Sequence, residues 1–291
     1  METEFVFSNE IFENIRRNPD EYIPIVKEVK RDIIKSLALA KSGHPGGSLG
    51  VAEFMVALFF GGYMQYDAKN PNWNQRDRFV LSAGHLAPVL YSCLAHAGYF
   101  STSELYNLRK LGFILQGHPA PVGVIPGNET ASGSLGQGIS IAVGMAINDK
   151  LLDKNNRKVF CLTGDGELQE GSCWEAAMAA AHYKLDNLCW FVDNNDCQID
   201  GRVKDVMSIY PLKEKFEAFG FKVIDIQGND ISHIIKALDE FVDGVGNIGK
   251  PVCIIGKTKM GNGVSFMQDN YKWHGNPPNI EQAIAALKEL E

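Results

Sequence analysis

The chain has 291 residues, of which 45% are hydrophobic, and its formal net charge is −7 at pH 7. This length and composition allow a substantial buried core within one domain. The basic residues are scattered along an acidic chain, so the broad positive surface that nucleic acid requires is absent and we expect no nucleic-acid partner.

Membrane and secretory functions are not expected either. The most apolar run covers residues 54–60, which is far shorter than the roughly 20 residues that cross a bilayer. The first residues contain no positively charged segment leading into an apolar stretch, so we predict no secretory signal and a cytoplasmic protein. The six cysteines are widely spaced without a CxxC pair, and we expect them to be buried, reduced thiols.

The first part of the chain alternates helices with strands. Apolar residues at four-residue steps from Ile25 to Leu37 predict a helix over residues 21–42. The glycine-rich segment at 42–48 is predicted to be a compact loop that presents His44. Further along, we predict a helix over 51–60, a strand over 77–82 and a helix that ends near residue 97.

The same alternation continues to the last residues. A helix of small residues is predicted at 139–147, and the strand 158–163, the helix 170–184 and the strand 187–193 form a βαβ unit. The remaining predicted elements are helices at 212–219, 231–242 and 281–290 and strands at 221–226 and 252–255. We therefore predict an α/β fold with a parallel sheet flanked by helices. It forms a single domain over 1–291, with an extension at about 1–20 and a carboxyl-terminal helix within 276–291.

Two short motifs follow the strands of this βαβ unit. Gly164-Asp165-Gly166 comes after the first strand, and Asn194-Asn195 comes after the second. Ligands bind beyond the carboxyl ends of parallel strands, so both motifs should face one crevice. A carboxylate, an amide oxygen and a backbone carbonyl suit Mg²⁺, and Gly166 lets the main chain approach a phosphate. We predict a site for magnesium and a diphosphate cofactor, with thiamine diphosphate as the first candidate.

Each motif is weak when taken alone. The glycine-aspartate-glycine triplet is also typical of an ordinary turn, and paired asparagines carry little information by themselves. Their spacing and their position after two apolar strands make the combination specific.

Four of the seven histidines lie in glycine-containing loops, namely His44, His85, His118 and His274. Imidazoles donate to phosphate or sugar hydroxyl oxygens and transfer protons near neutral pH, so together they suit a polyhydroxylated, anionic substrate. For any single one of them, an ordinary surface position is an equal alternative. No two histidines have the HxxxH or HxH spacing of zinc ligands on one element, so zinc is not predicted.

Six ordered segments resemble the amino-terminal, diphosphate-binding part of the transketolase family, over about residues 27–278. They are Ser42-Gly-His-Pro-Gly-Gly, Asp77-Arg-Phe-Val-Leu-Ser-Ala-Gly-His85, Gly117-His-Pro, Gly133-Ser-Leu-Gly-Gln-Gly-Ile-Ser, Gly164-Asp-Gly-Glu-Leu-Gln-Glu-Gly and Ile199-Asp-Gly. The resemblance implies a thiamine diphosphate-binding domain of the diphosphate-binding (PP) type. It also implies transfer of a two-carbon ketol unit from a ketose phosphate to an aldose phosphate, with thiamine diphosphate and Mg²⁺.

The resemblance also implies roles for individual residues. The metal ligands would be Asp165, Asn195 and the backbone carbonyl of Cys197. The cofactor would be held by His85, Gly133, Ser134, Leu135, Gly166, Asn195 and His274. The catalytic residues would be His44, His118 and His274 in the substrate channel and Glu170 at a subunit interface, where Glu175 is a second acidic residue.

The chain departs from the family pattern because it stops where most transketolases continue into a pyrimidine-binding domain and a carboxyl-terminal domain. We therefore expect a split transketolase whose partner is a separate carboxyl-terminal chain. Pairing two copies of this chain as a homodimer within an α2β2 assembly would restore the family's layout. A smaller departure is Glu167, beside the metal motif, where the family often has a small or neutral residue.

Two other interpretations remain open. One is a related thiamine diphosphate enzyme subunit, similar to deoxyxylulose phosphate synthase or to the α subunit of a 2-oxo acid dehydrogenase. The other is a non-catalytic cofactor-binding module. The sequence leaves the donor and acceptor sugars open.

Overall fold

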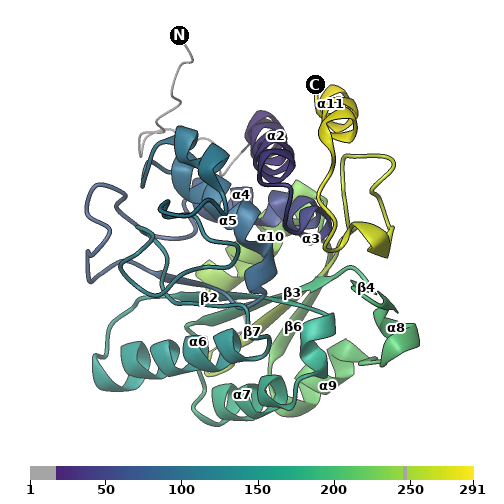
Figure 1. Ribbon diagram of the computed structural model, residues 1–291. Helices are drawn as coiled ribbons and strands as arrows, with labels where there is room; N and C mark the ends of the chain where they lie inside the picture. Colours follow the sequence, from purple (N-terminus) through teal and green to yellow (C-terminus); the bar gives the residue numbers. More distant parts are fainter. Residues whose placement is uncertain (1–17, 245–247) are drawn as a thin grey trace.

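A five-stranded parallel sheet forms the centre of the computed structural model, which describes residues 18–244 and 248–291 (Figure 1). The expected extension at about 1–20 therefore lies largely outside the described residues. The strands run in the order β1 (Arg78–Leu81), β2 (Val159–Gly164), β3 (Leu188–Asn194), β7 (Val252–Lys257) and β6 (Lys222–Gln227). All neighbouring pairs are parallel, which confirms the predicted fold class.

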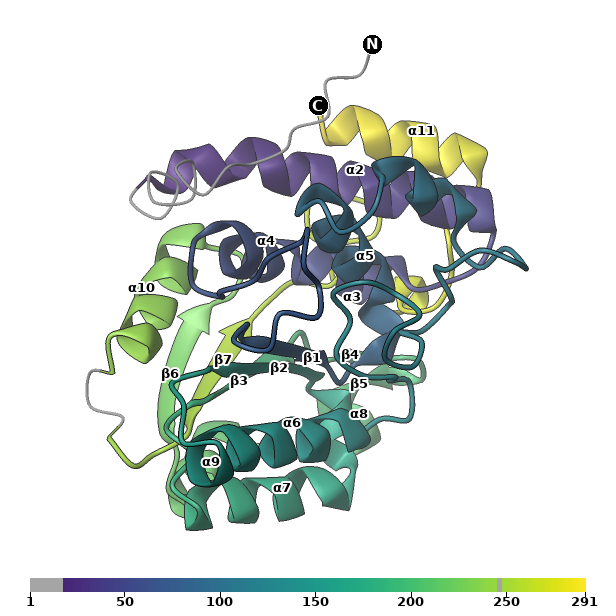
Figure 2. The same ribbon diagram turned by 90° about the vertical axis from the view of Figure 1, so that its left-hand side faces the viewer.

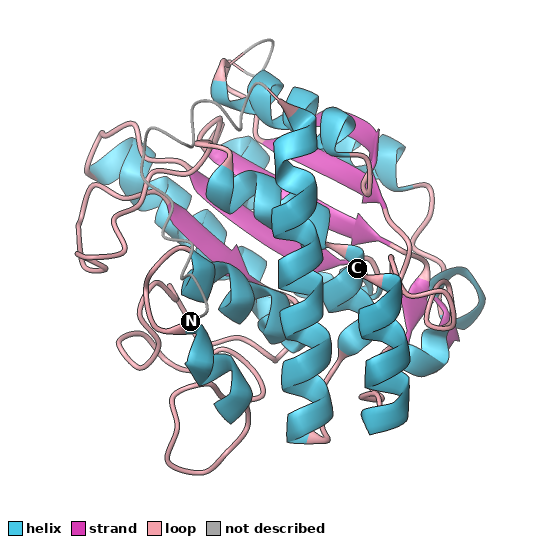
Figure 3. Ribbon diagram, turned by 90° about the horizontal axis from the view of Figure 1, so that it is seen from above, coloured by secondary structure: helices cyan, strands magenta, loops and turns pink. Residues whose placement is uncertain are grey.

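Helices cover both faces of the sheet (Figures 1 and 2). One face is covered by α6 (Gln137–Ile147), α7 (Gly171–His182) and α9 (Leu212–Phe219). The other is covered by α4 (Ala52–Phe60), α5 (Ala87–His96) and α10 (Ile231–Val242). Beyond these, α2 (Tyr22–Ala40) packs on α4 and α5, and α11 (Ile280–Glu289) lies beside α2 (Figure 3).

The strand order explains which face each crossover helix occupies. The chain advances in one direction from β1 through β2 and β3 to β6, and then turns back to insert β7 between β3 and β6. Crossovers between parallel strands are right-handed, so reversing the direction moves the connecting helix to the opposite face. This is why α10 lies across the sheet from α6, α7 and α9.

The central strand β3 supplies side chains to two cores. Phe191 faces one core, where its ring stacks on Phe54 of α4 with ring centroids 3.8 Å apart. Trp190 faces the other, where it packs on Phe216 and donates a hydrogen bond of 2.8 Å to Thr163. Successive strand residues point to opposite faces, so a strand covered on both sides is apolar throughout.

The segment predicted to be a compact loop at 42–48 differs from the structure. Residues Pro45–Gly50 form a short helix, α3, and all of them are buried. Its glycines make this possible, because a β-carbon at Gly47 would lie 2.4 Å from the Leu86 side chain and one at Gly46 would lie 2.6 Å from Met260. Close packing here outweighs the poor helix propensity of glycine.

Smaller elements complete the chain. The antiparallel pair β4 (Cys197–Gln198) and β5 (Gly201–Arg202) turns at Ile199 and Asp200 and leads into α8 (Val203–Val206). Short 3-10 helices are η1 (Pro19–Glu21), η2 (Gly84–Leu86), η3 (Thr102–Asn107), η5 (Gly166–Gln169) and η6 (Tyr271–Trp273), and the π-helical segment η4 (Asn148–Leu152) continues α6. Among the described residues, no helix combines the length and the apolarity needed to span a membrane.

Candidate active site

The two predicted motifs meet at the carboxyl ends of β2 and β3. One oxygen of the Asp165 carboxylate accepts the Gly166 backbone N–H at 2.8 Å, and the other accepts the Asp196 N–H at 2.6 Å. The Asn195 amide oxygen accepts the Cys197 N–H at 2.8 Å. The backbone that carries Asn195 is thus hydrogen-bonded to Asp165, and the two residues predicted to share an ion lie beside each other.

Two buried carboxylates lie at this point. Burial, and secondarily the neighbouring Asp193, hold the pKa of Asp165 well above its usual range. Burial raises the pKa of Asp193 to about 7, although Thr258 and Asn195 donate hydrogen bonds to it. Neither carboxylate forms an ion pair within residues 18–244 and 248–291. A bound dication would stabilise the ionised forms of these carboxylates.

The available ligands fit magnesium. Carboxylate and amide oxygens retain a second lone pair after accepting one hydrogen bond, so Asp165 and Asn195 keep oxygen donors for a metal. Mg²⁺ takes oxygen ligands together with phosphates. The Cys197 thiol is engaged with the Arg202 guanidinium at 3.1 Å. No group of three or more His, Cys, Asp or Glu side chains suited to a metal occurs in the described part of the chain.

Four histidines from separate segments form a second cluster. His44 precedes α3, His85 lies in η2, His118 lies in a loop and His274 follows η6. The His44 ring lies 5.3 Å from His85, 6.1 Å from His118 and 5.7 Å from His274, measured between centroids. The rings of His85 and His274 are 4.9 Å apart. The structure thus brings together all four histidines that the loop pattern singled out.

These imidazoles are neutral at physiological pH. Burial, followed by the neighbouring His274, Arg109 and His118, lowers the pKa of His44 to about 4. Burial is also the main cause that lowers the pKa of the other three rings, and that of His85 falls well below its usual value. The Nδ1 atoms of His44 and His274 are buried without a hydrogen-bond partner. Buried polar atoms normally have partners, so these two suit a polar ligand.

Arg109 connects two of the histidine loops and was not singled out from the sequence. Its guanidinium donates to the Ser42 hydroxyl at 3.1 Å and to the Gly117 carbonyl at 3.2 Å. Both partners lie close to a histidine in the chain, since Ser42 is followed by Gly43 and His44, and Gly117 by His118. A β-carbon at Gly117 would lie 2.6 Å from the guanidinium carbon, so a larger residue there would displace the guanidinium. No periodicity or motif marks this arginine.

The glycine loop Gly133–Leu135 lies beside the histidines and is exposed. A β-carbon at Gly133 would lie 3.2 Å from the His118 ring. A β-carbon at Gly84, next to His85, would lie 2.6 Å from the Gly133 nitrogen, so the two backbones are in contact. The loop leads directly into α6, and the free N–H groups in the first turn of a helix suit an anion.

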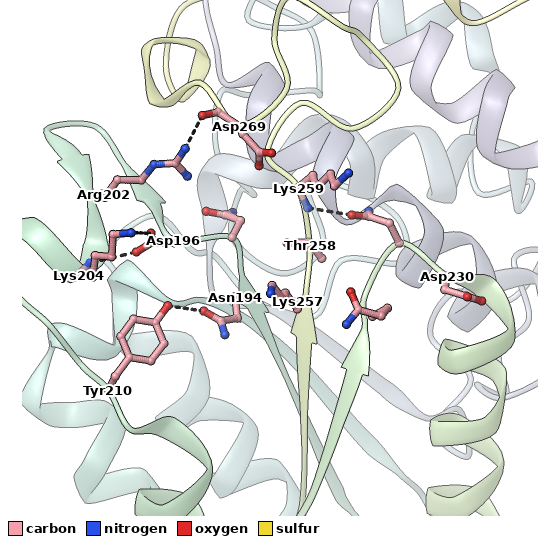
Figure 4. A pocket seen from close by; sticks show the side chains of 13 residues that line it. Asn194, Asp196, Arg202, Lys204, Tyr210, Asp230, Lys257, Thr258, Lys259 and Asp269 are labelled. Atoms are coloured by element: carbon pink, nitrogen blue, oxygen red, sulfur yellow. Dashed lines mark hydrogen bonds and ion pairs between the residues drawn. The ribbon is translucent and has the colours of Figure 1, made fainter.

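A cavity of about 840 Å³ adjoins the predicted metal site across the ends of β3, β7 and β6 (Figure 4). Its wall includes Asn195 and the cationic residues Lys204, Lys257 and Lys259. Tyr210 donates a hydrogen bond of 2.7 Å to Asn194 at its edge. Lys257 comes two residues after the last predicted strand, but the motifs assigned it no role. The signal was available, because a lysine at a strand's carboxyl end faces the ligand crevice.

The two acidic residues predicted at a subunit interface are on the surface. Glu170 is the residue directly before α7 and Glu175 is within it, and both are exposed. Apolar side chains are exposed nearby, including Met178 of α7 at 54% and Ile141 of α6 at 37%. An exposed surface that mixes apolar and acidic side chains is compatible with contact to another subunit.

The fold and the site define a class of protein. A parallel sheet covered on both faces, with oxygen ligands at two strand ends, a glycine loop before a helix and neutral histidines above, is suited to a diphosphate cofactor with a divalent metal. Residues 23–290 match the family model for the transketolase, thiamine diphosphate binding domain. The chain therefore belongs to the transketolase family.

Relatives of two lengths match the chain. It is 40% identical over 259 residues to transketolase of Homo sapiens, which covers 88% of this chain and 40% of that protein. It is 39% identical over 273 residues to one of the named subunits of apulose-4-phosphate transketolase from Actinobacillus succinogenes, which covers 94% of this chain and 96% of the relative. The transketolase structure from Leishmania mexicana superposes with a TM-score of 0.85 at 34% identity, over 92% of this chain and 41% of that one. The chain thus spans about two fifths of the full-length relatives.

Proposed function

We propose that this chain is the cofactor-binding subunit of a two-chain transketolase. Together with a separate carboxyl-terminal subunit, it would transfer a two-carbon ketol unit from a ketose phosphate to an aldose phosphate. The observation that carries the proposal is the meeting of the Asp165 and Asn195 oxygen donors with four neutral histidines at one edge of the sheet. The Actinobacillus relative, which the chain covers over 96% of its length, is itself named as one subunit of a transketolase and supports the two-chain assembly.

The metal and the diphosphate part of the cofactor would be held by residues of this chain. Asp165, Asn195 and the carbonyl of Cys197 would bind Mg²⁺. The cofactor would contact Gly166 beside the metal and, around it, His85, Gly133, Ser134, Leu135, Asn195 and His274. Lys257, on the wall of the adjoining cavity, adds a positive charge to this edge of the sheet. Thiamine diphosphate supplies a thiazolium carbanion that makes and breaks carbon–carbon bonds next to a carbonyl.

The histidines would handle the sugar. His44, His118 and His274 would line the substrate channel, where a neutral imidazole can accept a proton from one hydroxyl and donate a hydrogen bond to another. The unpartnered Nδ1 atoms of His44 and His274 are the donors or acceptors that a sugar hydroxyl or a developing oxyanion would satisfy. Such groups contribute on the order of 10²-fold or more to the rate when they are well placed.

We propose that two copies of this chain and two of the partner form the assembly. The exposed side chains on α6 and α7, among them Ile141, Glu175 and Met178, would lie between the two copies, and Glu170 would connect the two active sites there. The six cysteines are free and buried, which suits a cytoplasmic protein.

The test is reconstitution with the partner chain, followed by an assay of two-carbon transfer. The two chains should transfer a ketol unit between sugar phosphates only when both chains, thiamine diphosphate and Mg²⁺ are present. Apulose 4-phosphate is the first sugar phosphate to try, because the Actinobacillus relative is named for it. Rapid turnover of pyruvate without consumption of a ketose phosphate would favour a synthase or dehydrogenase subunit. A well-formed complex without any activity would favour a binding module.

A further inference from the structure

Glu167 is a buried carboxylate to which the proposed reaction gives no role. The residue is 2% exposed and lies in η5, two positions after Asp165. One of its oxygens accepts the Ser82 hydroxyl and the Gly136 N–H, the latter at 2.8 Å, and the other accepts the Gly164 N–H at 3.2 Å. Burying a carboxylate is costly unless donors surround it, and here three donors do so.

The three donors come from three different segments. Ser82 directly follows β1, three residues before His85; Gly164 ends β2, directly before Asp165; and Gly136 directly follows Leu135. Each segment carries residues that would hold the cofactor or its metal. One side chain therefore accepts hydrogen bonds from all three segments.

We propose that Glu167 is a positioning residue for the cofactor, whose carboxylate holds the ends of β1 and β2 and the glycine loop before α6 at the separation that thiamine diphosphate and its metal require. This inference rests on the proposed function. Holding binding groups in place before the ligand arrives lowers the ordering cost of binding, so affinity depends on such supports.

The backbone that carries Glu167 is itself held by α7. The Cys173 thiol donates to the Glu167 carbonyl at 3.4 Å, and the Trp174 indole donates to the next carbonyl, that of Leu168, at 2.9 Å. Both donors belong to α7, so η5 is fixed to a regular helix. The position of α7 therefore fixes the position of Glu167, and through it that of the three segments that donate hydrogen bonds to its carboxylate.

The segments that Glu167 joins also touch each other closely. A β-carbon at Gly84 would lie 2.6 Å from the Gly133 nitrogen, so the segment that follows β1 is in backbone contact with the glycine loop. Loops packed backbone to backbone cannot adjust independently, because close-packed interiors transmit displacements. Loss of one of the hydrogen bonds to Glu167 should therefore shift all three segments.

An acceptor-only group is needed at this position. An ionised carboxylate accepts with both oxygens, whereas the amide of glutamine has one oxygen and a donating NH₂ group. In Glu167→Gln, that NH₂ group would face either the Gly164 N–H or the pair formed by Gly136 and Ser82. The substitution keeps the shape of the side chain and leaves buried donors unpaired.

The experiment compares cofactor binding in the full two-chain complex with and without this substitution. We expect Glu167→Gln to raise the Kd for thiamine diphosphate, measured by calorimetry at saturating Mg²⁺, by about tenfold or more. The rise in Tm caused by adding cofactor should shrink accordingly, because stabilisation by a ligand follows its affinity.

The matched control is Asp32→Asn. Asp32 is also buried, and it accepts hydrogen bonds from Ser92 at 3.0 Å and His96 at 2.7 Å in the contact of α2 with α5. This carboxylate-to-amide change should lower the Tm of the free and the loaded complex equally and leave the Kd unchanged. A merely structural Glu167 would behave in the same way.

A second variant decides the question if Glu167→Gln does not assemble. Ser82→Ala removes one donor and keeps the carboxylate, and we expect the Kd to rise by about threefold, a smaller loss than that of the whole acceptor. Unchanged Kd in every variant that assembles, with normal binding by the wild-type complex, overturns the positioning role and leaves the proposed function intact. Failure of the wild-type complex to bind thiamine diphosphate overturns both the positioning role of Glu167 and the proposed function.

Discussion

The Asp165 carboxylate accepts the backbone N–H of Asp196 at 2.6 Å, which joins the end of β2 to the segment that follows β3. This bond runs through the backbone next to Asn195 and so places Asp165 beside that residue. The backbone thus holds the two residues on neighbouring segments, and a metal ion would be the group that joins their oxygens.

Replacement of Asp165 by asparagine should sharply weaken magnesium-dependent cofactor binding. The substitution keeps the size of the side chain and removes the negative charge that a dication would offset. We expect the affinity for thiamine diphosphate with Mg²⁺ to fall by about tenfold or more, which is about 1.4 kcal/mol or more. Calorimetry with and without Mg²⁺ measures this. Asp186→Asn, at the opposite end of β3 where Asp186 pairs with Lys150, is the control and should bind normally.

The pH dependence of stability should report the neutral state of His44. Its pKa is about 4 in the folded protein, whereas the ordinary pKa of a histidine is 6.5, so the unfolded chain binds a proton that the folded chain does not. The free energy of unfolding should therefore fall as the pH decreases from about 6.5 towards about 4. Urea unfolding at several pH values should show a shallower fall in His44→Gln. His182→Gln, at the end of α7, serves as the comparison, and an identical slope in both variants would contradict this account.

Removal of Arg109 should raise the pKa of two histidines. Burial is the largest cause that lowers the pKa of His118, and the charge of Arg109 is the second. The charge of Arg109 also lowers the pKa of His44. In Arg109→Met, NMR titration of the histidine ring protons should give higher pKa values for both rings. Arg109→Lys should keep the low values, since the charge remains, but should still weaken sugar binding, since a lysine cannot bridge Ser42 and Gly117. Unshifted titrations in the methionine variant would show that the cation has no influence.

Phe191→Ala should destabilise the sheet strongly. The ring is fully buried, stacks on Phe54 at 3.8 Å and fills the space that Gly256 leaves open, where a β-carbon would lie 2.3 Å away. A phenylalanine-to-alanine change in a packed core costs about 3–5 kcal/mol. Urea unfolding measures the loss. Leu111→Ala, at a side chain that is fully exposed, should change stability by less than about 0.5 kcal/mol.

Met178→Asp should separate the two proposed copies of this chain. Met178 is 54% exposed on α7, the helix that carries the acidic residue Glu175 expected at the interface. A charge placed within an apolar contact is desolvated without a partner, which weakens association. Sedimentation of the two-chain complex should show loss of the larger species. Met207→Asp, at a site 62% exposed directly after α8, should leave it intact, and equal behaviour of the two variants would place the interface elsewhere.

The sequence alone predicted most elements of the fold, because their patterns are local. The strands around residues 160, 190 and 254 are unbroken apolar runs, and the structure confirms them as β2, β3 and β7. The helix α3 was missed because its glycines are poor helix formers, and only packing against Leu86 and Met260 makes the helix favourable.

The sequence also singled out Asp165, Asn195 and the four loop histidines, since each follows a strand or lies in a turn that exposes its side chain. Only the tertiary structure revealed that Arg109 bridges two histidine loops and that Glu167 joins the ends of β1 and β2 to the glycine loop before α6. Those roles depend on partners far apart in the chain, such as Ser82 and Glu167. A hydrogen bond between distant residues leaves no spacing or periodicity in the sequence, because the folded backbone alone brings the donor to the acceptor.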